Sequence, residues 1–120
     1  MTGLSGQKAS YIRDLAEQTQ AKRVDFATIG YLTDADVIEH LTQVKGIGVW
    51  TAHMFLIFAL RRHDVLPCAD LGVRAAIKRA YKLDALPDAK QIEELALAWR
   101  PYCSVATWYL WRSLDGPAKL

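Results

Sequence analysis

Apolar and polar positions recur along this chain with the period of an amphipathic α-helix. In residues 7–20 the apolar side chains follow helical spacing, and charged side chains occupy the positions between them. The same spacing predicts a short helical piece and five further helices, at residues 24–29, 34–44, 49–60, 70–81, 88–100 and 102–114. No stretch alternates with the period of two that favours a β-strand. The pattern therefore predicts a single all-α domain over residues 1–120.

Local side chains mark where several of these helices begin. Thr33 precedes an acidic first turn, and Asp88 is followed by Gln91 at the spacing of a capping box. The helix at 70–81 and the one after it have predicted buried faces, formed by Leu71, Val73, Ala76, Ile77 and Ala80 on the first and by Ile92, Leu95 and Trp99 on the second. The first six residues and the tail from Asp115 have no comparable signal, and we expect them to be loose.

The stretch at residues 41–60, LTQVKGIGVWTAHMFLIFAL, organises the middle of the chain. It predicts a helix that ends at Val44, a tight turn through Lys45 and Gly48, and a second helix. The second helix is apolar nearly all round, which is typical of a helix at the centre of a bundle.

The turn itself has the features of an anion site. Its two glycines permit a positive φ and leave no Cβ beside a ligand. The helix that follows presents free N–H groups and the positive end of its dipole, and Lys45 adds a charge, so a phosphate would fit there. Ile47, between the glycines, is expected to point inward. An ordinary helix–helix corner, with glycines only for tightness, has the same pattern and stays open as an alternative.

Two motifs of the chain resemble those of a known family. The first is L-x-x-V-K-G-I-G-x-W-T-A in the turn region, and the second is LPCADLGVRAAI at residues 66–77. Together they resemble the helix-hairpin-helix (HhH-GPD) DNA glycosylase superfamily, and within it the 3-methyladenine DNA glycosylase II type. The resemblance implies a helix-hairpin-helix glycosylase-like helical bundle whose partner is double-stranded DNA containing alkylated bases. It places the DNA phosphate contact at Lys45, Gly46, Ile47, Gly48 and Thr51.

Asp70 matches the catalytic aspartate of that family, within a loop and helix at residues 65–81. Cleavage of an N-glycosidic bond builds positive charge on the sugar, so a nearby carboxylate stabilises the transition state and can orient the attacking water. An alkylated purine is already cationic and leaves readily, so a separate general acid is not needed. Read from the residues alone, an Asp at a helix start is more often only an N-cap.

The resemblance also implies a base pocket formed by Trp50, Met54 and Trp111. Trp111 falls where the alkylbase enzymes place a tryptophan that stacks on the base, although a plain core tryptophan is the alternative. Met54 stands where those enzymes have a second aromatic side chain. Trp50 occupies the position at which the lyase members have a Schiff-base lysine, which indicates a monofunctional hydrolase.

The resemblance implies no required cofactor. It does imply a structural monovalent cation, sodium or potassium, bound at the hairpin by the backbone carbonyls of Thr42, Val44 and Ile47. The two cysteines, Cys68 and Cys103, do not have the spacing of a zinc site or an iron–sulfur cluster, and they fit a reduced, cytoplasmic protein. In a bacterium this localisation would be with the nucleoid, and in a eukaryote it would be nuclear.

Charge adds a weak signal for nucleic acid. The net charge of the 120 residues is only +2, but most of the middle of the chain is basic. The basic residues there are Lys45, Arg61, Arg62, Arg74, Lys78, Arg79 and Lys82, against the acidic Asp64 and Asp70. A phosphate-facing surface and a solvated helix face both have this pattern. The most apolar run, residues 54–60, is shorter than the roughly 20 residues that a membrane span needs.

The resemblance extends from about Gly6 to Leu114 and leaves out the upstream half of the family domain. We therefore expect a partial domain, whose exposed apolar faces a homodimer partner or a complementing N-terminal segment would cover. The expected function is base-excision repair by hydrolysis of the N-glycosidic bond of alkylated purines. The alternatives are a non-catalytic helix-hairpin-helix DNA-binding module, or an inactive fragment that dimerises.

Overall fold

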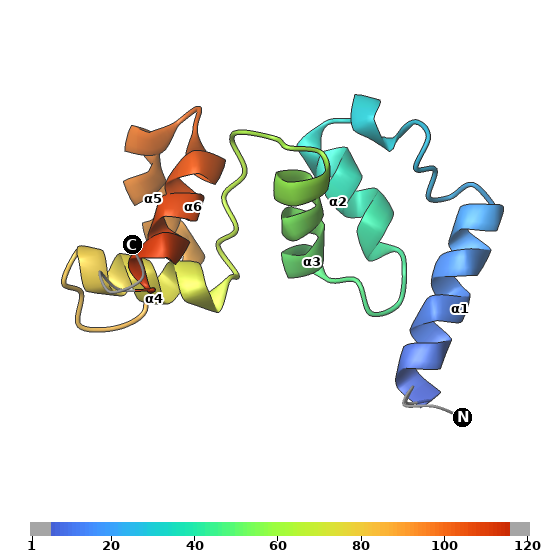
Figure 1. Ribbon diagram of the computed structural model, residues 1–120, viewed down its shortest axis with the longest axis horizontal. Coiled ribbons are helices and arrows are strands. Elements are labelled where there is room, and N and C mark those ends of the chain that lie inside the picture. Colours follow the sequence, from blue (N-terminus) through green and yellow to red (C-terminus); the bar gives the residue numbers. More distant parts are fainter. Residues whose placement is uncertain (1–5, 116–120) are drawn as a thin grey trace. The chain divides into compact units, whose positions relative to one another are not determined.

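Helices form all of the regular secondary structure in the part of the chain that the structure describes. The computed structural model describes residues 6–115, and no strand occurs among them. The prediction of an all-α fold is confirmed. The chain divides into two compact units between Leu56 and Ile57, which contain α1 to α3 and α4 to α6 respectively (Figure 1). Most of the ends expected to be loose, residues 1–5 and 116–120, lie outside the described residues. Gly6 and Asp115 are described: Gly6 begins α1, and the Asp115 N–H donates to the Arg112 carbonyl at 3.0 Å.

The N-terminal unit contains three α-helices and one short 3₁₀ helix. These are α1 (Gly6–Gln20), η1 (Ile29–Tyr31), α2 (Asp34–Thr42) and α3 (Val49–Met54). Its buried apolar side chains come mainly from α2, α3 and the connecting loops, and they include Val24, Ile29, Val37, Leu41, Val44, Ala52 and Leu56. Helix α1 has no fully buried residue, and Ile12 on it is 55% exposed. The core of this unit is therefore small.

Two boundaries in this unit differ from the prediction. The helical piece predicted at residues 24–29 is wrong, because those residues form turns and the 3₁₀ helix begins only at Ile29. The capping signal at Thr33 is confirmed, since its hydroxyl accepts the Asp36 N–H at 3.2 Å. Helix α2 ends at Thr42, before Val44, whose N–H donates to the Leu41 carbonyl at 3.1 Å in a tighter turn.

The segment after the hairpin departs most from its prediction. Helix α3 gives way to a π-helical turn, η2 (Phe55–Ala59), so the regular helix is shorter than expected. Only two of its side chains, Ala52 and Leu56, are buried, while Trp50 is 50% and Phe58 59% exposed. The expectation of a helix buried all round was therefore wrong. Apolar composition predicted the helix but not which of its faces is covered.

The C-terminal unit is built on α4 (Leu71–Ala80), α5 (Ala89–Ala96) and α6 (Cys103–Ser113), with a 3₁₀ turn, η3 (Leu97–Trp99), after α5 (Figure 1). Its core cluster comes from the loop before α4 and from all three helices, and consists of Leu66, Val73, Ile77, Ile92, Ala96 and Cys103. Leu95 and Trp99 pack against this cluster, as predicted. The capping box of Asp88 and Gln91 is present in full.

Not every predicted core position of α4 is buried. Val73, Ala76 and Ile77 are fully covered, but Leu71 is 64% exposed and Ala80 also faces solvent. Leu71 and Ala80 are the first and last residues of the helix, so neighbouring elements do not extend far enough to cover them. The buried stripe of α4 is therefore limited to its central turns.

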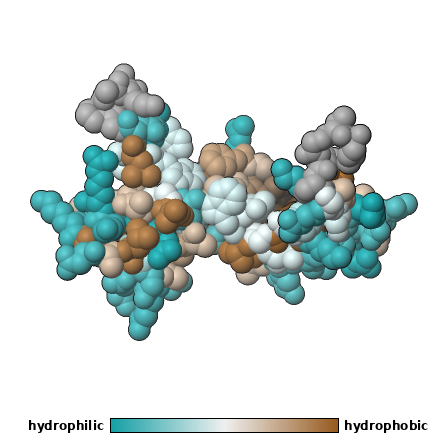
Figure 2. Space-filling model, turned by 90° about the horizontal axis from the view of Figure 1, so that it is seen from below, coloured by the Kyte–Doolittle hydropathy of each residue, from teal (hydrophilic) through white to brown (hydrophobic). Residues whose placement is uncertain are grey.

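Large apolar side chains remain on the surface of both units. In the C-terminal unit they include Phe58, Leu97, Val105, Trp108 and Tyr109, each at least 45% exposed. Figure 2 shows hydrophobic patches interspersed with hydrophilic side chains on the face that it draws. No helix among residues 6–115 combines the length and apolarity that crossing a membrane would require.

Candidate functional site

The two glycines of the hairpin have different conformations and different neighbours. Gly46 has a φ of +86°, the left-handed region that favours glycine. Gly48 is the N-cap of α3 with a φ of −97°, and a Cβ added to it would meet nothing within 4 Å. The turn between them closes by the Ile47 N–H donating to the Val44 carbonyl at 3.1 Å. The hairpin therefore requires glycine at position 46, whereas position 48 has open space.

Helix α1 holds the hairpin through contacts that the sequence did not reveal. The Lys45 N–H donates to the Asp14 carboxylate at 2.8 Å, across 31 residues of chain. A Cβ on Gly46 would overlap the ring of Tyr11, so that ring packs directly on the glycine backbone. Ile47 is half-buried and, with Tyr11 and Val44, helps to line a small cavity of about 140 Å³. The inward orientation expected of Ile47 agrees with this position.

These contacts restrict how the hairpin could hold a phosphate. The N–H groups of Lys45 and Ile47 both donate within the protein. The predicted phosphate site therefore relies on the N–H groups of Gly46 and Gly48, with the Lys45 ammonium beside them. Thr51 is exposed on the first turn of α3, where a hydroxyl can add a hydrogen bond. The phosphate site stays a prediction.

The carbonyl site for a monovalent cation also stays a prediction. One of its three expected ligands, the Val44 carbonyl, already accepts the Ile47 N–H, which leaves it a second lone pair for an ion. The three expected ligands are neutral carbonyl groups. They suit a monovalent cation, because such an ion needs no charged ligand. Among residues 6–115, no three or more His, Cys, Asp or Glu side chains cluster in a way that would hold another metal.

Asp70 is the N-cap of α4 in the C-terminal unit. Its side chain is nearly buried, with 8% of the residue exposed. The Oδ2 atom accepts the Val73 N–H at 2.8 Å, which satisfies one of the free donors at the helix start. Asp70 is thus an N-cap, which is what its position at a helix start indicates without the family resemblance. Its carboxylate also makes a contact that capping does not require.

That second contact is with Trp111 on α6. The indole Nε1–H donates to the same Oδ2 atom of Asp70 at 2.8 Å, across 41 residues of chain. The indole ring also stacks on Phe58, with the ring centroids 5.8 Å apart and the planes at 13°. The structure therefore brings together two of the predicted site residues, Asp70 and Trp111, and adds Phe58, which sequence reasoning missed.

The other predicted pocket residues lie on the N-terminal unit. Trp50 and Met54 are on α3, where Trp50 is half-exposed and Met54 is partly buried. Their grouping with Trp111 into one base pocket stays a prediction. The resemblance to the glycosylase family was the only signal for them, and their positions four apart on α3 place them on the same face of that helix.

A glycine sits beside the contact between Asp70 and Trp111. Gly72 is the second residue of α4. A Cβ added to it would lie 3.1 Å from Asp70 Oδ2 and 3.4 Å and 3.5 Å from Cδ1 and Nε1 of Trp111. The motif DLGV contained this glycine, but nothing in the sequence indicated which side chain it accommodates.

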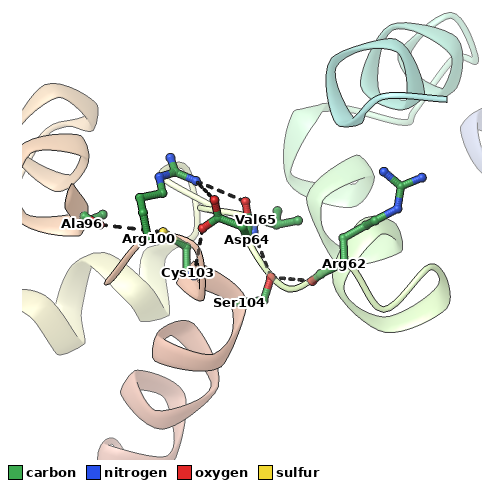
Figure 3. A network of polar contacts seen from close by, with 7 residues as sticks. All are labelled: Arg62, Asp64, Val65, Ala96, Arg100, Cys103 and Ser104. Atoms are coloured by element: carbon green, nitrogen blue, oxygen red, sulfur yellow. Dashed lines mark hydrogen bonds and ion pairs between the residues drawn. The ribbon is translucent and has the colours of Figure 1, made fainter. Parts of the chain in front are cut away.

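The start of α6 is fixed by the loop that precedes Asp70. Tyr102, the N-cap of α6, provides no side-chain cap, and Asp64 acts in its place by accepting the Cys103 N–H at 3.0 Å (Figure 3). The Ser104 N–H donates to the His63 carbonyl at 2.8 Å. The Ser104 hydroxyl donates to the Arg62 carbonyl at 2.7 Å and accepts the Val65 N–H at 2.9 Å. The helix that carries Trp111 is thereby tied to the loop that leads to Asp70.

An ion pair completes this network. Arg100 lies 3.1 Å from Asp64 Oδ2 and also donates to the Asp64 carbonyl at 3.2 Å (Figure 3). Burial tends to raise the pKa of Asp64, but the hydrogen bond from Cys103 and the Arg100 charge outweigh it, so that the pKa is lowered. The pKa of the buried Cys103 thiol is raised to about 12, first by burial and then by its hydrogen bond with Asp64. Cys103 is therefore a neutral core residue, not a nucleophile.

Several other ionisable residues have structural roles. Burial lowers the pKa of His53, partly offset by Asp34, which makes the imidazole a neutral, structural side chain near neutral pH. Two members of the basic run make hydrogen bonds within the unit: Arg74 Nε donates to the Pro87 carbonyl at 3.0 Å and Arg79 to the Ser113 carbonyl at 3.4 Å. The basic run is therefore not uniformly a ligand-facing surface.

A cavity of about 500 Å³ lies on the C-terminal unit, with Phe58 in its wall. Its lining combines aromatic, apolar and basic side chains, namely Ile57, Phe58, Arg61, Arg62, His63, Ser104, Val105, Trp108 and Tyr109. Arg112 adds a cation over the Trp108 ring, 5.3 Å from its centroid. Neither Asp70 nor Trp111 lines this cavity, but Phe58 lines it and also stacks on Trp111.

Comparison with known proteins identifies sequence relatives over most of the chain. Residues 1–101 match the family model described as HhH-GPD superfamily base excision DNA repair protein. DNA-3-methyladenine glycosylase 1 of Schizosaccharomyces pombe is 34% identical over 112 residues, 92% of this chain and 49% of that protein. A putative DNA-3-methyladenine glycosylase of Bacillus subtilis, YfjP, is 34% identical over 111 residues, 92% of this chain and 39% of that protein.

Solved structures give the same picture. The 3-methyladenine DNA glycosylase of S. pombe, in complex with abasic DNA, matches with a TM-score of 0.86 and 33% identity over 96% of this chain and 56% of that one. A DNA-3-methyladenine glycosidase from Bacillus halodurans matches with a TM-score of 0.84 and 39% identity over 98% of this chain and 54% of that one. The chain thus spans about half the length of these relatives, or less. The predicted helix-hairpin-helix glycosylase fold is confirmed.

Proposed function

Because the chain belongs to the HhH-GPD superfamily of base excision DNA repair proteins, we propose that it acts in the removal of damaged bases from DNA. The proposed reaction is hydrolysis of the N-glycosidic bond of an alkylated purine in double-stranded DNA. The relatives named as DNA-3-methyladenine glycosylases support this substrate class. The observation that carries the proposal is the carboxylate of Asp70, held at a helix start and bonded to the indole of Trp111.

Asp70 provides negative charge where the reaction creates positive charge. As the bond between C1′ and the purine nitrogen breaks, its electron pair leaves with the base and discharges the cationic purine. The sugar gains oxocarbenium character, which a nearly buried carboxylate stabilises more strongly than a solvated one. The oxygen of a water molecule then bonds to C1′, and the carboxylate accepts its proton before passing it to solvent.

Trp111 supports the same chemistry in two ways. Its Nε1–H orients the carboxylate through the 2.8 Å hydrogen bond to Oδ2. The face of the indole that is not stacked on Phe58 would offer a cationic base a favourable stacking surface. The indole would thereby connect recognition of the base to placement of the catalytic group.

We further propose that the reaction stops at the abasic site. A lyase of this superfamily needs an amine that forms a Schiff base with the sugar. The corresponding position in this chain is Trp50, whose indole is not a nucleophile. The proposed products are therefore the free base and an intact strand with an abasic site.

The proposal is tested with DNA that contains 7-methylguanine and 3-methyladenine, by chromatography of the released bases. Asp70→Asn keeps the shape of the side chain and loses its charge, so release should fall roughly 100-fold or more while affinity for abasic DNA persists. Asp84→Asn, an exposed position on the same unit, is the matched control and should be unchanged. Strands should break only after added alkali.

Since the chain covers about half of its relatives' length, the assay includes a chimera. In it, this chain replaces the matched part of the S. pombe glycosylase. If neither the chain nor the chimera releases a methylated purine, or if Asp70→Asn releases it at the original rate, the enzyme proposal is wrong. Retained, salt-dependent DNA binding without base release would identify a non-catalytic DNA-binding module instead.

A further inference from the structure

We propose that Gly72 is a positioning residue that allows Asp70 and Trp111 to form one coupled pair. The proposal rests on the function proposed above for Asp70. It is carried by the lack of room for a Cβ at Gly72, which would lie too close to the Asp70 carboxylate and in contact with the Trp111 indole. It assigns a role to a residue that carries no reactive group.

The backbone does not explain why a glycine occupies this position. Gly72 lies within α4, where every residue has α-helical geometry, and glycine is the least favourable ordinary residue in a helix. Alanine would favour the helix more. A glycine near the start of α4 therefore needs a spatial reason.

The surroundings of Gly72 supply that reason. A Cβ there would lie 3.1 Å from Asp70 Oδ2, the atom that accepts both the Val73 N–H and the Trp111 Nε1–H. It would also lie 3.4 Å and 3.5 Å from two atoms of the indole. Because 3.1 Å is shorter than most contacts of a Cβ atom, the carboxylate would have to move by a few tenths of an ångström. The distances to the indole are ordinary van der Waals contacts, so the indole closes the other side of the space around the added methyl group.

Each of the two side chains is held by a further contact. Asp70 Oδ2 is fixed by the Val73 N–H at 2.8 Å, and the indole is stacked on Phe58. A methyl group at position 72 would therefore act mainly on the 2.8 Å bond between Oδ2 and Nε1. Gly72 thus leaves the room that the carboxylate needs to accept the hydrogen bond from the indole N–H.

The test uses nuclear magnetic resonance on the chain as it is, without DNA. The four tryptophans give four indole N–H signals, and Trp111→Phe identifies the one from Trp111. Asp70→Asn should shift this signal, because it changes the acceptor of the indole N–H. Gly72→Ala should shift it as well, and Asp70→Asn should add little in the Gly72→Ala background. Gly6→Ala, which places a methyl group in open space, should leave it in place.

Stability and kinetics separate positioning from a purely structural role. The melting temperature of Gly72→Ala should not fall below that of the original protein, because alanine favours the helix. In the excision assay its kcat should fall about tenfold with little change in KM, since the loss lies in the transition state. Should the variant be less stable, adding Trp111→Phe should restore the stability of Trp111→Phe alone.

Several results would overturn the proposal. They are an unmoved Trp111 signal in Gly72→Ala, an Asp70→Asn shift of equal size in both backgrounds, or a stability defect that Trp111→Phe does not relieve. Failure of the proposed enzymatic function looks different: base release would be absent from the original chain and the chimera, while the coupling between the Trp111 signal, Asp70 and Gly72 would still be present.

Discussion

The hairpin of the N-terminal unit and the Asp70 site of the C-terminal unit are both helix starts, but they are completed in opposite ways. Helix α3 begins at Gly48, which has no side chain to cap it. Helix α4 begins at Asp70, whose carboxylate accepts the Val73 N–H. One helix start thus has no side-chain cap, and the other contains an anion of the protein's own.

This difference suggests how one structural feature serves two kinds of charge. A helix N-terminus favours negative charge because of its free N–H groups and its dipole. Without a capping side chain it suits the phosphate of a DNA strand. With an aspartate in place, the favourable interaction is used within the protein, and the carboxylate can face positive charge on a substrate. The choice of N-cap residue therefore distinguishes the proposed phosphate site at Gly48 from the proposed catalytic group at Asp70.

The largest effect is expected from giving the hairpin an anion of its own. Gly48→Asp turns the N-cap of α3 into the kind of cap that α4 has, and the open space around Gly48 accommodates the side chain. The carboxylate would occupy the predicted phosphate position, so affinity for duplex DNA should fall roughly 100-fold, or ~2.8 kcal/mol. Fluorescence titration with labelled DNA measures the fall.

Gly48→Ala is the control for this substitution, because it adds bulk without charge. It should retain most of the affinity, and both variants should keep the helical circular dichroism of the original protein. Unchanged DNA binding by Gly48→Asp would remove the hairpin from the DNA interface.

A smaller effect, on folding instead of binding, is expected at the other hairpin glycine. Gly46→Ala places a Cβ at a φ of +86° and against the Tyr11 ring. The backbone cost alone is about 1–2 kcal/mol, and displacement of Tyr11 from the hairpin adds to it. Urea unfolding should show this loss in Gly46→Ala and not in Gly48→Ala. Equal stability of the two variants would contradict the division of roles between the glycines.

The smallest effect concerns the cap that Asp64 provides to α6. Its pKa is lower in the folded protein than the ordinary value of 3.8, so its contribution to stability is complete above that pH and is lost as the pH falls through the folded pKa. Asp64→Asn should therefore cost about 1 kcal/mol at pH 7 and less at pH 3, which lies below the ordinary pKa of the carboxyl group. Urea unfolding at both pH values measures the difference, with Asp84→Asn as the control. A cost that does not depend on pH would show that charge is not involved.

Local sequence was sufficient for the parts of the fold that depend on neighbouring residues. The caps at Thr33 and Asp88 follow from side chains three residues from the N–H groups that they accept. Asp70 was found by its motif, and its cap is likewise a local contact. Periodicity also predicted the other α-helices to within a few residues at their ends, but it did not predict the early end of α3 at Met54 or the turns in place of a helix at residues 24–29.

The contacts that build the site are not local, and the sequence did not predict them. Trp111 and Asp70 are 41 residues apart, Asp64 and Cys103 39, and Asp14 and Lys45 31. Each joins two helices or loops whose packing must be known first. The exposure of Phe58 could not be predicted for the same reason, since an apolar side chain is compatible with either face of a helix until its neighbours are placed.

The network at the start of α6 also limits the degrees of freedom of Trp111. Hydrogen bonds hold Cys103 and Ser104 at one end of the helix, and the bond to Asp70 holds Trp111 near the other, roughly 12 Å along at 1.5 Å per residue. The Ser104 hydroxyl and the Trp111 indole both project from the helix axis, so these contacts oppose rotation about it as well as sliding along it. The direction in which the indole points from the helix is therefore set by contacts at both ends of α6. It depends little on how tightly the middle of the helix is packed.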